Sequence, residues 1–191
     1  MDFLNETSEY EIFLAGEKIL STADEEPRIA FLQGGVACRL AQKKGSFGIF
    51  LTAGEWLGVE QIDRGHGLEL SWVAKTECQV VFRPLSILHE GWTAEHYSIL
   101  KSVVRQQTQT TQQTLLGQQS REEQMDWALE ERIKLLDRGE MIANKRFVDL
   151  PREETAKETG VDAPYISRYI TKLCKEGKAV RYQSGIVLLN Q

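Results

Sequence analysis

Residues 151–189 read PREETAKETGVDAPYISRYITKLCKEGKAVRYQSGIVLL, and they carry the most specific signal in the chain. Pro151 suits the first turn of a short helix, because the N–H that proline lacks would be unpaired there anyway. Gly160 ends that helix, and Asp162 can cap a second one. Residues 179–189 then alternate around a Gln-Ser-Gly turn, which predicts a β-hairpin. Two helices joined by a tight glycine-containing turn and followed by a hairpin make a winged helix-turn-helix.

The second helix of this stretch, expected from about Ala163 to Lys175, has two chemically different faces. Ile166, Ile170 and Leu173 fall at helical spacing, with Tyr169 flanking them, and would face the core. The residues left outside are Pro164, Ser167, Arg168, Thr171, Lys172 and Lys175. A cationic helix face without acids suits the major groove of DNA, where arginine donates two hydrogen bonds to a guanine edge. The alternative is a helix-turn-helix that serves only protein packing.

The charge distribution points to the same segment. The chain carries 23 Lys and Arg against 28 Asp and Glu, a net charge of −5. Residues 163–182 nevertheless hold five cations and Glu176 as the one acid, a local charge of +4. A cationic segment on an acidic protein predicts a local anionic partner rather than a generally adhesive surface. An ordinary solvated helix face is the alternative on charge alone.

The first ninety residues predict short strands separated by glycine-containing turns. The expected strands, rich in β-branched and aromatic residues, are Ile29–Leu32, Val36–Leu40, Phe47–Leu51, Leu68–Val73 and Gln79–Phe82. Many short strands at regular spacing are typical of a β-sandwich or a small β-barrel.

The middle of the chain predicts helices. From Thr93 to Pro151 there is no proline, and Tyr97, Leu100 and Val104 recur at helical spacing. Residues 106–114, QQTQTTQQT, weaken that helix, since each threonine costs about 0.5 kcal/mol relative to alanine. Either packing against a partner keeps this run helical, or it is a flexible linker.

A second helix is expected after the Gln/Thr run. Leu115-Leu116-Gly117 resembles a helix end. The sequence Ser120-Arg121-Glu122-Glu123 is a capping box that opens the next helix, and Gly139 would close it.

Composition excludes several classes of protein. No apolar run approaches the roughly 18 residues that span a bilayer, and the acidic N-terminus does not resemble a signal peptide. The three cysteines, which lie far apart and contain no Cys-x-x-Cys pair, are Cys38, Cys78 and Cys174. They exclude a four-cysteine zinc site and a disulfide framework, and they favour a cytoplasmic location. Because no apolar run is long enough to span a bilayer, we also expect no membrane partner.

Catalytic and metal-binding patterns are absent from the sequence. The histidines, which show no metal-ligand spacing, are His66, His89 and His96. No nucleophile elbow or phosphate-binding loop occurs. We therefore expect no enzyme activity, no metal and no cofactor. A small-molecule-binding or catalytic barrel, with a cupin-type metal site for example, is the alternative from another class.

The order of these parts resembles the catabolite-activator and fumarate-nitrate-reduction regulator (CRP/FNR) superfamily over nearly the whole chain. In the barrel the resemblance rests on Ala15–Leu20, Leu32–Val36, Ala53–Gly58 and Ala74–Val80. In the C-terminal part it rests on Asp149–Glu154, Gly160-Val161 and Ile166-Ser167-Arg168. Each motif is weak alone, and their order and spacing together are specific.

The resemblance implies an α+β fold and three domains. Residues 1–92 would form a sensor-like β-barrel of the double-stranded β-helix or jelly-roll type. Residues 93–117 would form a long dimerisation helix, with Gly117 near the hinge. Residues 118–191 would form a DNA-binding winged helix-turn-helix.

The resemblance also implies a homodimeric transcription regulator on a palindromic operator in double-stranded DNA, with RNA polymerase as a further candidate partner and an unknown effector. Its expected DNA-binding residues are Tyr165, Ser167, Arg168, Thr171, Lys172, Lys175 and Ser184.

Departures from the family pattern qualify this function. Cyclic-nucleotide-binding members follow the glycine at Gly58 with a glutamate that holds the ribose, where this chain has Val59. Counting back from Ala74 places Leu68 and Glu69 where those members have an Arg-Ser pair for the phosphate. Because a carboxylate repels phosphate, we expect no control by cyclic AMP. The barrel then senses another signal, or it is a ligand-independent scaffold.

The recognition helix departs from the pattern at one position. Family members commonly have a glutamate three residues before Ser-Arg, and here Pro164 stands at that position before Ser167-Arg168. Arg168 is still expected to read a guanine. The missing contact to a cytosine predicts an operator that differs from the common family sequence.

Overall fold

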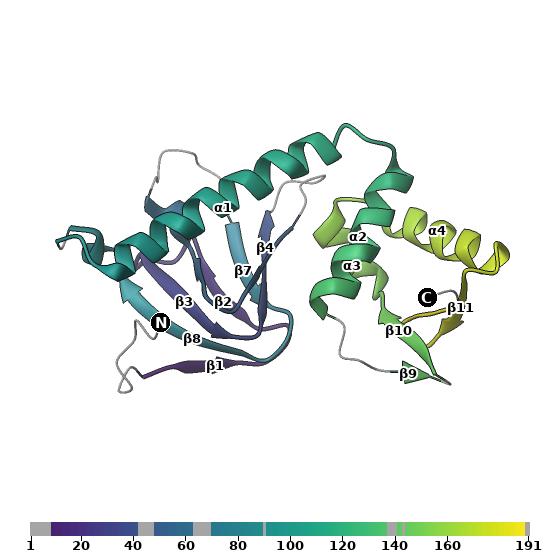
Figure 1. Cartoon of the computed structure of the whole chain (residues 1–191), viewed down its shortest axis with the longest axis horizontal. Coiled ribbons are helices and arrows are strands. Elements are labelled where there is room, and N and C mark those ends of the chain that lie inside the picture. The colour runs from purple at the N-terminus through teal and green to yellow at the C-terminus, as the bar shows by residue number, and fades with distance from the viewer. Residues whose placement is uncertain are drawn as a thin grey trace. The chain divides into compact units, whose positions relative to one another are not determined.

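The computed structural model describes residues 9–41, 48–62, 70–89, 91–136, 141–142 and 144–189 (Figure 1). These residues divide into two compact units. Residues 9–41 and 49–113 belong to the first unit, and residues 114–189 belong to the second. The first unit contains two β-sheets and one long helix, and helices form most of the second unit, so the expected mixture of α and β structure is confirmed.

Two four-stranded antiparallel sheets build the first unit. One sheet has the spatial order β1 (Glu11–Phe13), β8 (Cys78–Pro84), β3 (Arg28–Gly34) and β6 (Glu55–Leu57). The other has the order β2 (Lys18–Ser21), β7 (Leu70–Ala74), β4 (Val36–Ala41) and β5 (Ile49–Thr52). One apolar cluster draws on both sheets, with Leu32 and Val80 from the first and Leu51 and Trp72 from the second. The core therefore lies between the sheets.

The expected strands are present as β3, β4, β5, β7 and β8. Phe47 and Leu68, the expected first residues of two of them, lie outside the described residues. Three further strands, β1, β2 and β6, were not predicted, and they are only three or four residues long. Runs this short carry too few residues for an alternating pattern to stand out.

Helix α1 (Ala94–Leu116) packs along the two sheets of the first unit, which we call the barrel, as Figure 1 shows. Ile99 joins an apolar cluster with Ile29 and Trp56. Two polar side chains on the same face also reach the barrel. The Trp56 N–H donates to the Ser102 hydroxyl at 3.1 Å, and the Gln106 amide donates to the Trp56 carbonyl at 2.7 Å. The barrel thus fixes one face of the helix.

The Gln/Thr run is helical throughout, so the flexible-linker alternative is wrong. The hydroxyls of Thr108, Thr110 and Thr111 donate to the carbonyls four residues earlier at 2.9–3.0 Å. Such bonds give each hydroxyl a partner within its own turn of helix. These hydroxyls are therefore already hydrogen-bonded within α1.

The second unit starts with helix α2 (Arg121–Leu136). The expected capping box is confirmed: the Ser120 N–H donates to the Glu123 carboxylate at 2.9 Å, and the Glu123 N–H donates to the Ser120 hydroxyl at 3.3 Å. Gly139, the expected end of this helix, lies outside the described residues.

Two shorter helices follow, α3 (Arg152–Thr159) and α4 (Ala163–Lys175). Gly160 ends α3 with φ of 66°, a left-handed conformation that glycine adopts without a steric cost. Asp162 caps α4, because its carboxylate accepts a 2.8 Å hydrogen bond from the Tyr165 N–H. The expected turn between the helices therefore forms as the sequence indicates.

A four-stranded sheet completes the second unit. Its spatial order is β11 (Ala179–Tyr182), β12 (Gly185–Leu188), β10 (Lys145–Asp149) and β9 (Met141–Ile142). Strands β11 and β12 are the expected hairpin, whereas β9 and β10 were not predicted. Gly185 lets β12 lie close to β10, because a Cβ there would stand 2.1 Å from the Val148 carbonyl oxygen.

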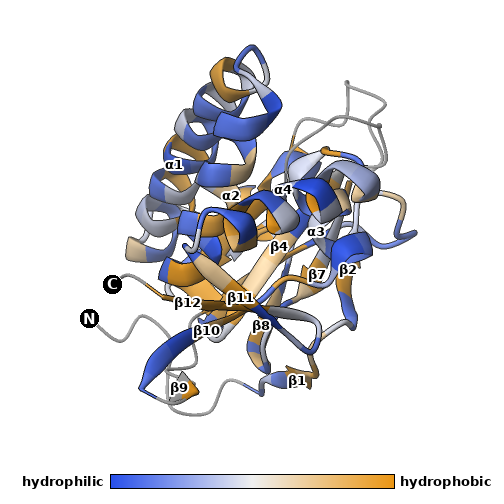
Figure 2. Ribbon diagram, turned by 90° about the vertical axis from the view of Figure 1, so that its right-hand side faces the viewer, coloured by the Kyte–Doolittle hydropathy of each residue, from blue (hydrophilic) through white to orange (hydrophobic). Residues whose placement is uncertain are grey.

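The core of the second unit holds α4 in place by its apolar side, and Figure 2 shows hydrophobic and hydrophilic colours alternating along this helix. Ile166, Ile170 and Leu173 are buried, as expected. Tyr169 is buried beside them and donates a hydrogen bond to Asp126 on α2. Burial and this bond raise the pKa of the Tyr169 phenol, so it remains a neutral donor.

Candidate nucleic-acid interface

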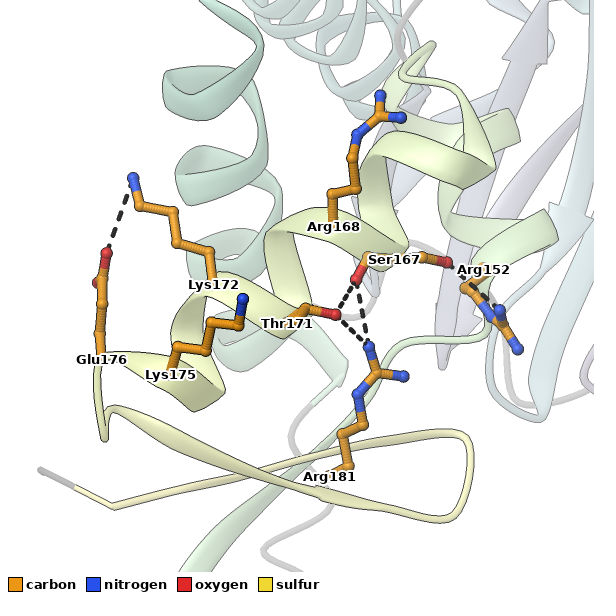
Figure 3. Close-up of a pocket in the computed structure, with 8 residues that line it drawn as sticks. All are labelled: Arg152, Ser167, Arg168, Thr171, Lys172, Lys175, Glu176 and Arg181. Carbon is orange, nitrogen blue, oxygen red and sulfur yellow. Dashed lines mark hydrogen bonds and ion pairs between the residues drawn. The ribbon is translucent and has the colours of Figure 1, made fainter.

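The exposed side of α4 and the β11–β12 hairpin border a surface hollow of about 770 Å³, which we call the α4 groove (Figure 3). Its lining residues are Arg152, Ser167, Arg168, Thr171, Lys172, Lys175, Glu176 and Arg181. Five of these eight are cationic and one is acidic. Cations concentrated in a concave surface favour an anionic ligand.

Arg181 connects the hairpin to α4 (Figure 3). Its Nη2 donates to the Thr171 hydroxyl oxygen at 2.6 Å and to the Ser167 carbonyl oxygen at 3.2 Å. The Thr171 hydroxyl in turn donates to the Ser167 carbonyl at 2.8 Å. One guanidinium nitrogen is therefore engaged by two acceptors on α4. Nε and Nη1 remain as the donors that Arg181 can offer to a ligand.

Arg152, at the start of α3, approaches the same part of α4. Its Nη1 lies 3.3 Å from the Ser167 hydroxyl oxygen, to which it donates. That hydroxyl donates to the Ala163 carbonyl at 3.2 Å. The Ser167 side chain is thus already hydrogen-bonded on both its donor and acceptor sides.

The two lysines of the groove differ in their surroundings. Lys172 forms ion pairs with Glu122 on α2 and, at 3.8 Å, with Glu176. The hydrogen bond to Glu122 raises the pKa of the Lys172 ammonium group. Lys175 pairs with no acid in the part of the chain that the structure describes. A phosphate therefore competes with carboxylates at Lys172 and meets an uncompensated charge at Lys175.

Arg168 is exposed near the first turn of α4 and makes one aromatic contact. Its guanidinium carbon lies 5.6 Å from the centre of the Tyr165 ring, a cation–π distance. Arg121 on α2 contacts the same ring at 5.8 Å. The ring holds the Arg168 side chain without using its N–H donors, which stay available for a bidentate contact.

Ser184 lies in the hairpin turn, outside the residues that line the α4 groove. Its hydroxyl donates to the Asp149 carboxylate. The groove thus brings together five of the seven residues expected from the sequence, with Tyr165 beside them. It does not include Ser184.

Arg152 and Arg181 belong to the groove and were not among the expected site residues. Arg181 was counted in the cationic segment, and Arg152 directly follows Pro151. Their positions in the site depend on how α3 and the hairpin pack on α4. The rule that could have found them is that cations on the elements flanking a recognition helix also face the ligand.

Solved structures share this fold over nearly the whole chain. A CRP/FNR-family transcriptional regulator from Thermus thermophilus gives a TM-score of 0.76 at 18% sequence identity, covering 95% of this chain and 94% of that one. The c-di-GMP-responsive global regulator CLP of Xanthomonas campestris gives 0.77 at 15% identity, over 96% and 95%. A cyclic nucleotide-binding domain-containing protein from Listeria monocytogenes gives 0.64 at 15% identity, over 94% and 88%.

The chain has the CRP/FNR fold. At these identities the likeness concerns the fold, and it covers both units. No protein-family model and no curated protein sequence matches the chain.

Of the three barrel residues that stand where cyclic-nucleotide-binding members hold the nucleotide, the structure describes Val59. Val59 begins a short 3₁₀ helix, η1 (Val59–Ile62), and is buried in the apolar cluster that contains Trp56. Leu68 and Glu69 lie outside the described residues. Arg39 on β4 forms an ion pair with Glu60 and donates to the Thr110 hydroxyl at 3.1 Å. The charge of Arg39 is therefore already balanced by a carboxylate.

His96 is held in place by hydrogen bonds, whereas His89 is exposed. His96 is buried, with one ring nitrogen 2.9 Å from the Ile87 carbonyl and the other 2.8 Å from the Thr93 hydroxyl. His66 lies outside the described residues. Among the described residues, no three His, Cys, Asp or Glu side chains gather closely enough to hold a metal ion. No helix in the same residues has the length and apolar character to cross a membrane.

Proposed function

We propose that this chain is a sequence-specific, DNA-binding transcription regulator that acts as a homodimer on a palindromic operator. The observation that carries the proposal is the α4 groove, where five cations and one acid surround the exposed side of a helix. A polar, cationic helix beside a hairpin suits entry into the major groove with phosphate contacts on either side. The CRP/FNR fold supports the same function, since its neighbours include transcription regulators.

The outer face of α1 supports the homodimer. Tyr97, Leu100 and Val104 are 68%, 48% and 59% exposed on the side of the helix away from the barrel. Thr111 lies seven residues after Val104, one heptad further along the same line, and Leu115 follows four residues later. The occupant that fits a self-complementary stripe on one helix is the same helix of a second copy.

We propose that cyclic AMP does not regulate this protein. Val59 is buried where a ribose-binding glutamate would be needed, and Arg39, a partly buried cation close to η1, is paired with Glu60. We propose that the barrel either senses another ligand or serves as a ligand-independent scaffold. RNA polymerase is proposed as a further partner because of the resemblance, and the cytoplasm is proposed as the location because of the scattered cysteines.

The experiment is a gel shift with the full-length chain and fragments of its own genomic neighbourhood, with and without unrelated competitor DNA. Lys175→Ala removes a cation from the groove, and Lys134→Ala removes an exposed cation from α2 as the matched control. We expect a band that resists competitor and is weakened by Lys175→Ala only.

Failure to shift any fragment at low salt would overturn the proposal. A dimer that binds no DNA would instead favour the other class, a small-molecule-binding or catalytic barrel whose helix pair only packs. Equal weakening by Lys134→Ala and Lys175→Ala would mean that the groove is not the interface.

A further inference from the structure

Thr171 lies at the centre of the α4 groove with its hydroxyl already engaged (Figure 3). A threonine hydroxyl has one hydrogen to donate and two lone pairs. The hydrogen goes to the Ser167 carbonyl at 2.8 Å, and one lone pair accepts from Arg181 at 2.6 Å. A direct hydrogen bond from Thr171 to a phosphate or a base acceptor would break the first of these bonds.

The polar neighbours of Thr171 reinforce this arrangement. Arg181 donates to the Ser167 carbonyl as well as to Thr171, so one guanidinium nitrogen bridges two atoms of α4. Turning the Thr171 hydroxyl toward the groove would break two hydrogen bonds, the one that it donates to the Ser167 carbonyl and the one that it accepts from Arg181. The hydroxyl therefore faces the protein, and the group that Thr171 offers to a ligand is its methyl.

The major-groove edge of DNA contains one matching apolar group. Thymine alone carries a 5-methyl there, and threonine methyl groups contact it in major-groove recognition. Thr171 lies three residues after Arg168, about 4.5 Å along the helix axis. Base pairs stack about 3.4 Å apart along each strand, so the two side chains reach adjacent base pairs.

We propose that Thr171 reads the 5-methyl group of a thymine next to the guanine that Arg168 reads. The inference rests on the proposed function and goes beyond it, because it assigns a base and a chemical group to one side chain. It differs from the simpler expectation for Thr171, in which the hydroxyl contacts a phosphate or a base.

The test starts from an operator selected by the full-length protein from a random pool of DNA duplexes. In the selected duplex each thymine is replaced in turn by uracil, in both half-sites, which removes only the 5-methyl group. Affinity is measured by fluorescence anisotropy at one fixed salt concentration. One replacement, beside the base pair whose preference Arg168→Ala relaxes, should weaken binding about four-fold per half-site, the value of one buried methyl.

Two variants of nearly equal size separate the methyl from the hydroxyl. Thr171→Val keeps a methyl in the groove and removes the hydroxyl, so the thymine-to-uracil ratio should persist even if overall affinity changes. Thr171→Ser keeps the hydroxyl bonds and removes the methyl, so the ratio should fall to about one. The ratio is insensitive to a general loss of folding, because both duplexes meet the same protein preparation.

The outcomes distinguish this inference from the proposed function. If no motif is selected, the proposed function fails and the inference fails with it. If a motif is selected but uracil replaces every thymine without effect, only the inference is overturned. A thymine preference that survives Thr171→Ser and disappears in Thr171→Val would assign the contact to the hydroxyl, which also overturns the inference.

Discussion

The guanidinium of Arg132 on α2 lies 2.6 Å from the carboxylate of Glu158 on α3, and both side chains are almost completely buried, at 6% and 2% exposure. Arg132 also donates to the Asp149 carbonyl at 3.0 Å, at the end of β10. One side chain thus joins α2, α3 and the sheet. This contact helps to position α3, the helix from which Arg152 reaches the α4 groove.

Arg132→Met should strongly destabilise the second unit, because it removes the Arg132 cation from the buried Glu158 carboxylate. Breaking a buried pair in this way typically costs about 3–5 kcal/mol. Urea unfolding followed by tryptophan fluorescence measures the change. The double variant Arg132→Met with Glu158→Leu should recover most of the loss, since neither charge then remains. Recovery of nothing by the double variant would show that the packing of Arg132, rather than its charge, is what matters.

The exposed apolar line on α1, which we propose as the dimer seam, predicts that an added charge there disrupts the dimer. Val104→Glu places a carboxylate in the middle of the exposed apolar line on α1, opposite its own copy in the partner. We expect light scattering to give a dimer for the unmodified chain and a monomer for this variant at micromolar concentration. Gln112→Glu adds the same charge on an exposed position of α1 beside the seam and should leave the dimer intact. A monomeric unmodified chain would remove the paired recognition helices that a palindromic operator needs.

Cyclic AMP should leave the thermal stability of the protein unchanged. A ligand that binds only the folded state at 100 times its dissociation constant adds about 2.7 kcal/mol of stability, which a melting curve resolves easily. With Val59 buried in an apolar cluster, the ribose lacks its usual acidic partner. A clear upward shift of Tm with millimolar cyclic AMP would mean that the residues between Gly58 and Ala74 are aligned incorrectly with the nucleotide-binding members.

The cysteines should differ sharply in reactivity. Cys38 and Cys78 are buried, and burial raises the pKa of the Cys78 thiol, so little of the reactive thiolate forms there. Cys174 on α4 is only partly buried. We expect a thiol reagent to modify one cysteine quickly in the folded protein and the other two only in denaturant. Cys174→Ser should abolish the fast reaction, whereas three fast equivalents would contradict the burial of the barrel cysteines.

Local sequence signals were sufficient to predict helix boundaries where a single residue determines the local backbone conformation. Gly160, Asp162 and the Ser120–Glu123 capping box each act through bonds to near neighbours, so the helix bounds around them could be predicted. The apolar spacing of α4 likewise determined which of its faces is buried.

The partners of the groove side chains depend on tertiary contacts, which the sequence did not reveal. Thr171 and Ser167 were expected among the DNA-binding residues, and the structure shows in addition that Arg181 and Arg152 engage their hydroxyls from positions 10 and 15 residues away. Lys172 similarly pairs with Glu122, 50 residues earlier in the chain. Such pairings depend on how α2, α3 and the hairpin pack around α4, and no periodicity or composition encodes them.

Arg168 is expected to determine base preference, and Lys175 to determine affinity for DNA of any sequence. Arg168 is exposed early in α4, and within the described residues its guanidinium lies over the Tyr165 ring and forms no hydrogen bond or ion pair. Arg168→Ala should therefore cost about 1–3 kcal/mol per half-site and relax the preference at one base pair, symmetrically about the dyad. The measurement is selection from a random pool with each protein, followed by titration of the preferred duplex.

Lys175→Ala is the matched comparison on the same helix. Its ammonium group carries no sequence information and meets phosphate, so the variant should weaken all duplexes alike and lower the slope of log affinity against log salt by about one. If Arg168→Ala instead lowered specific and nonspecific affinity by the same factor, Arg168 would be a phosphate contact. The base-reading position would then have to lie elsewhere on α4, because the register of the helix in the groove would be different.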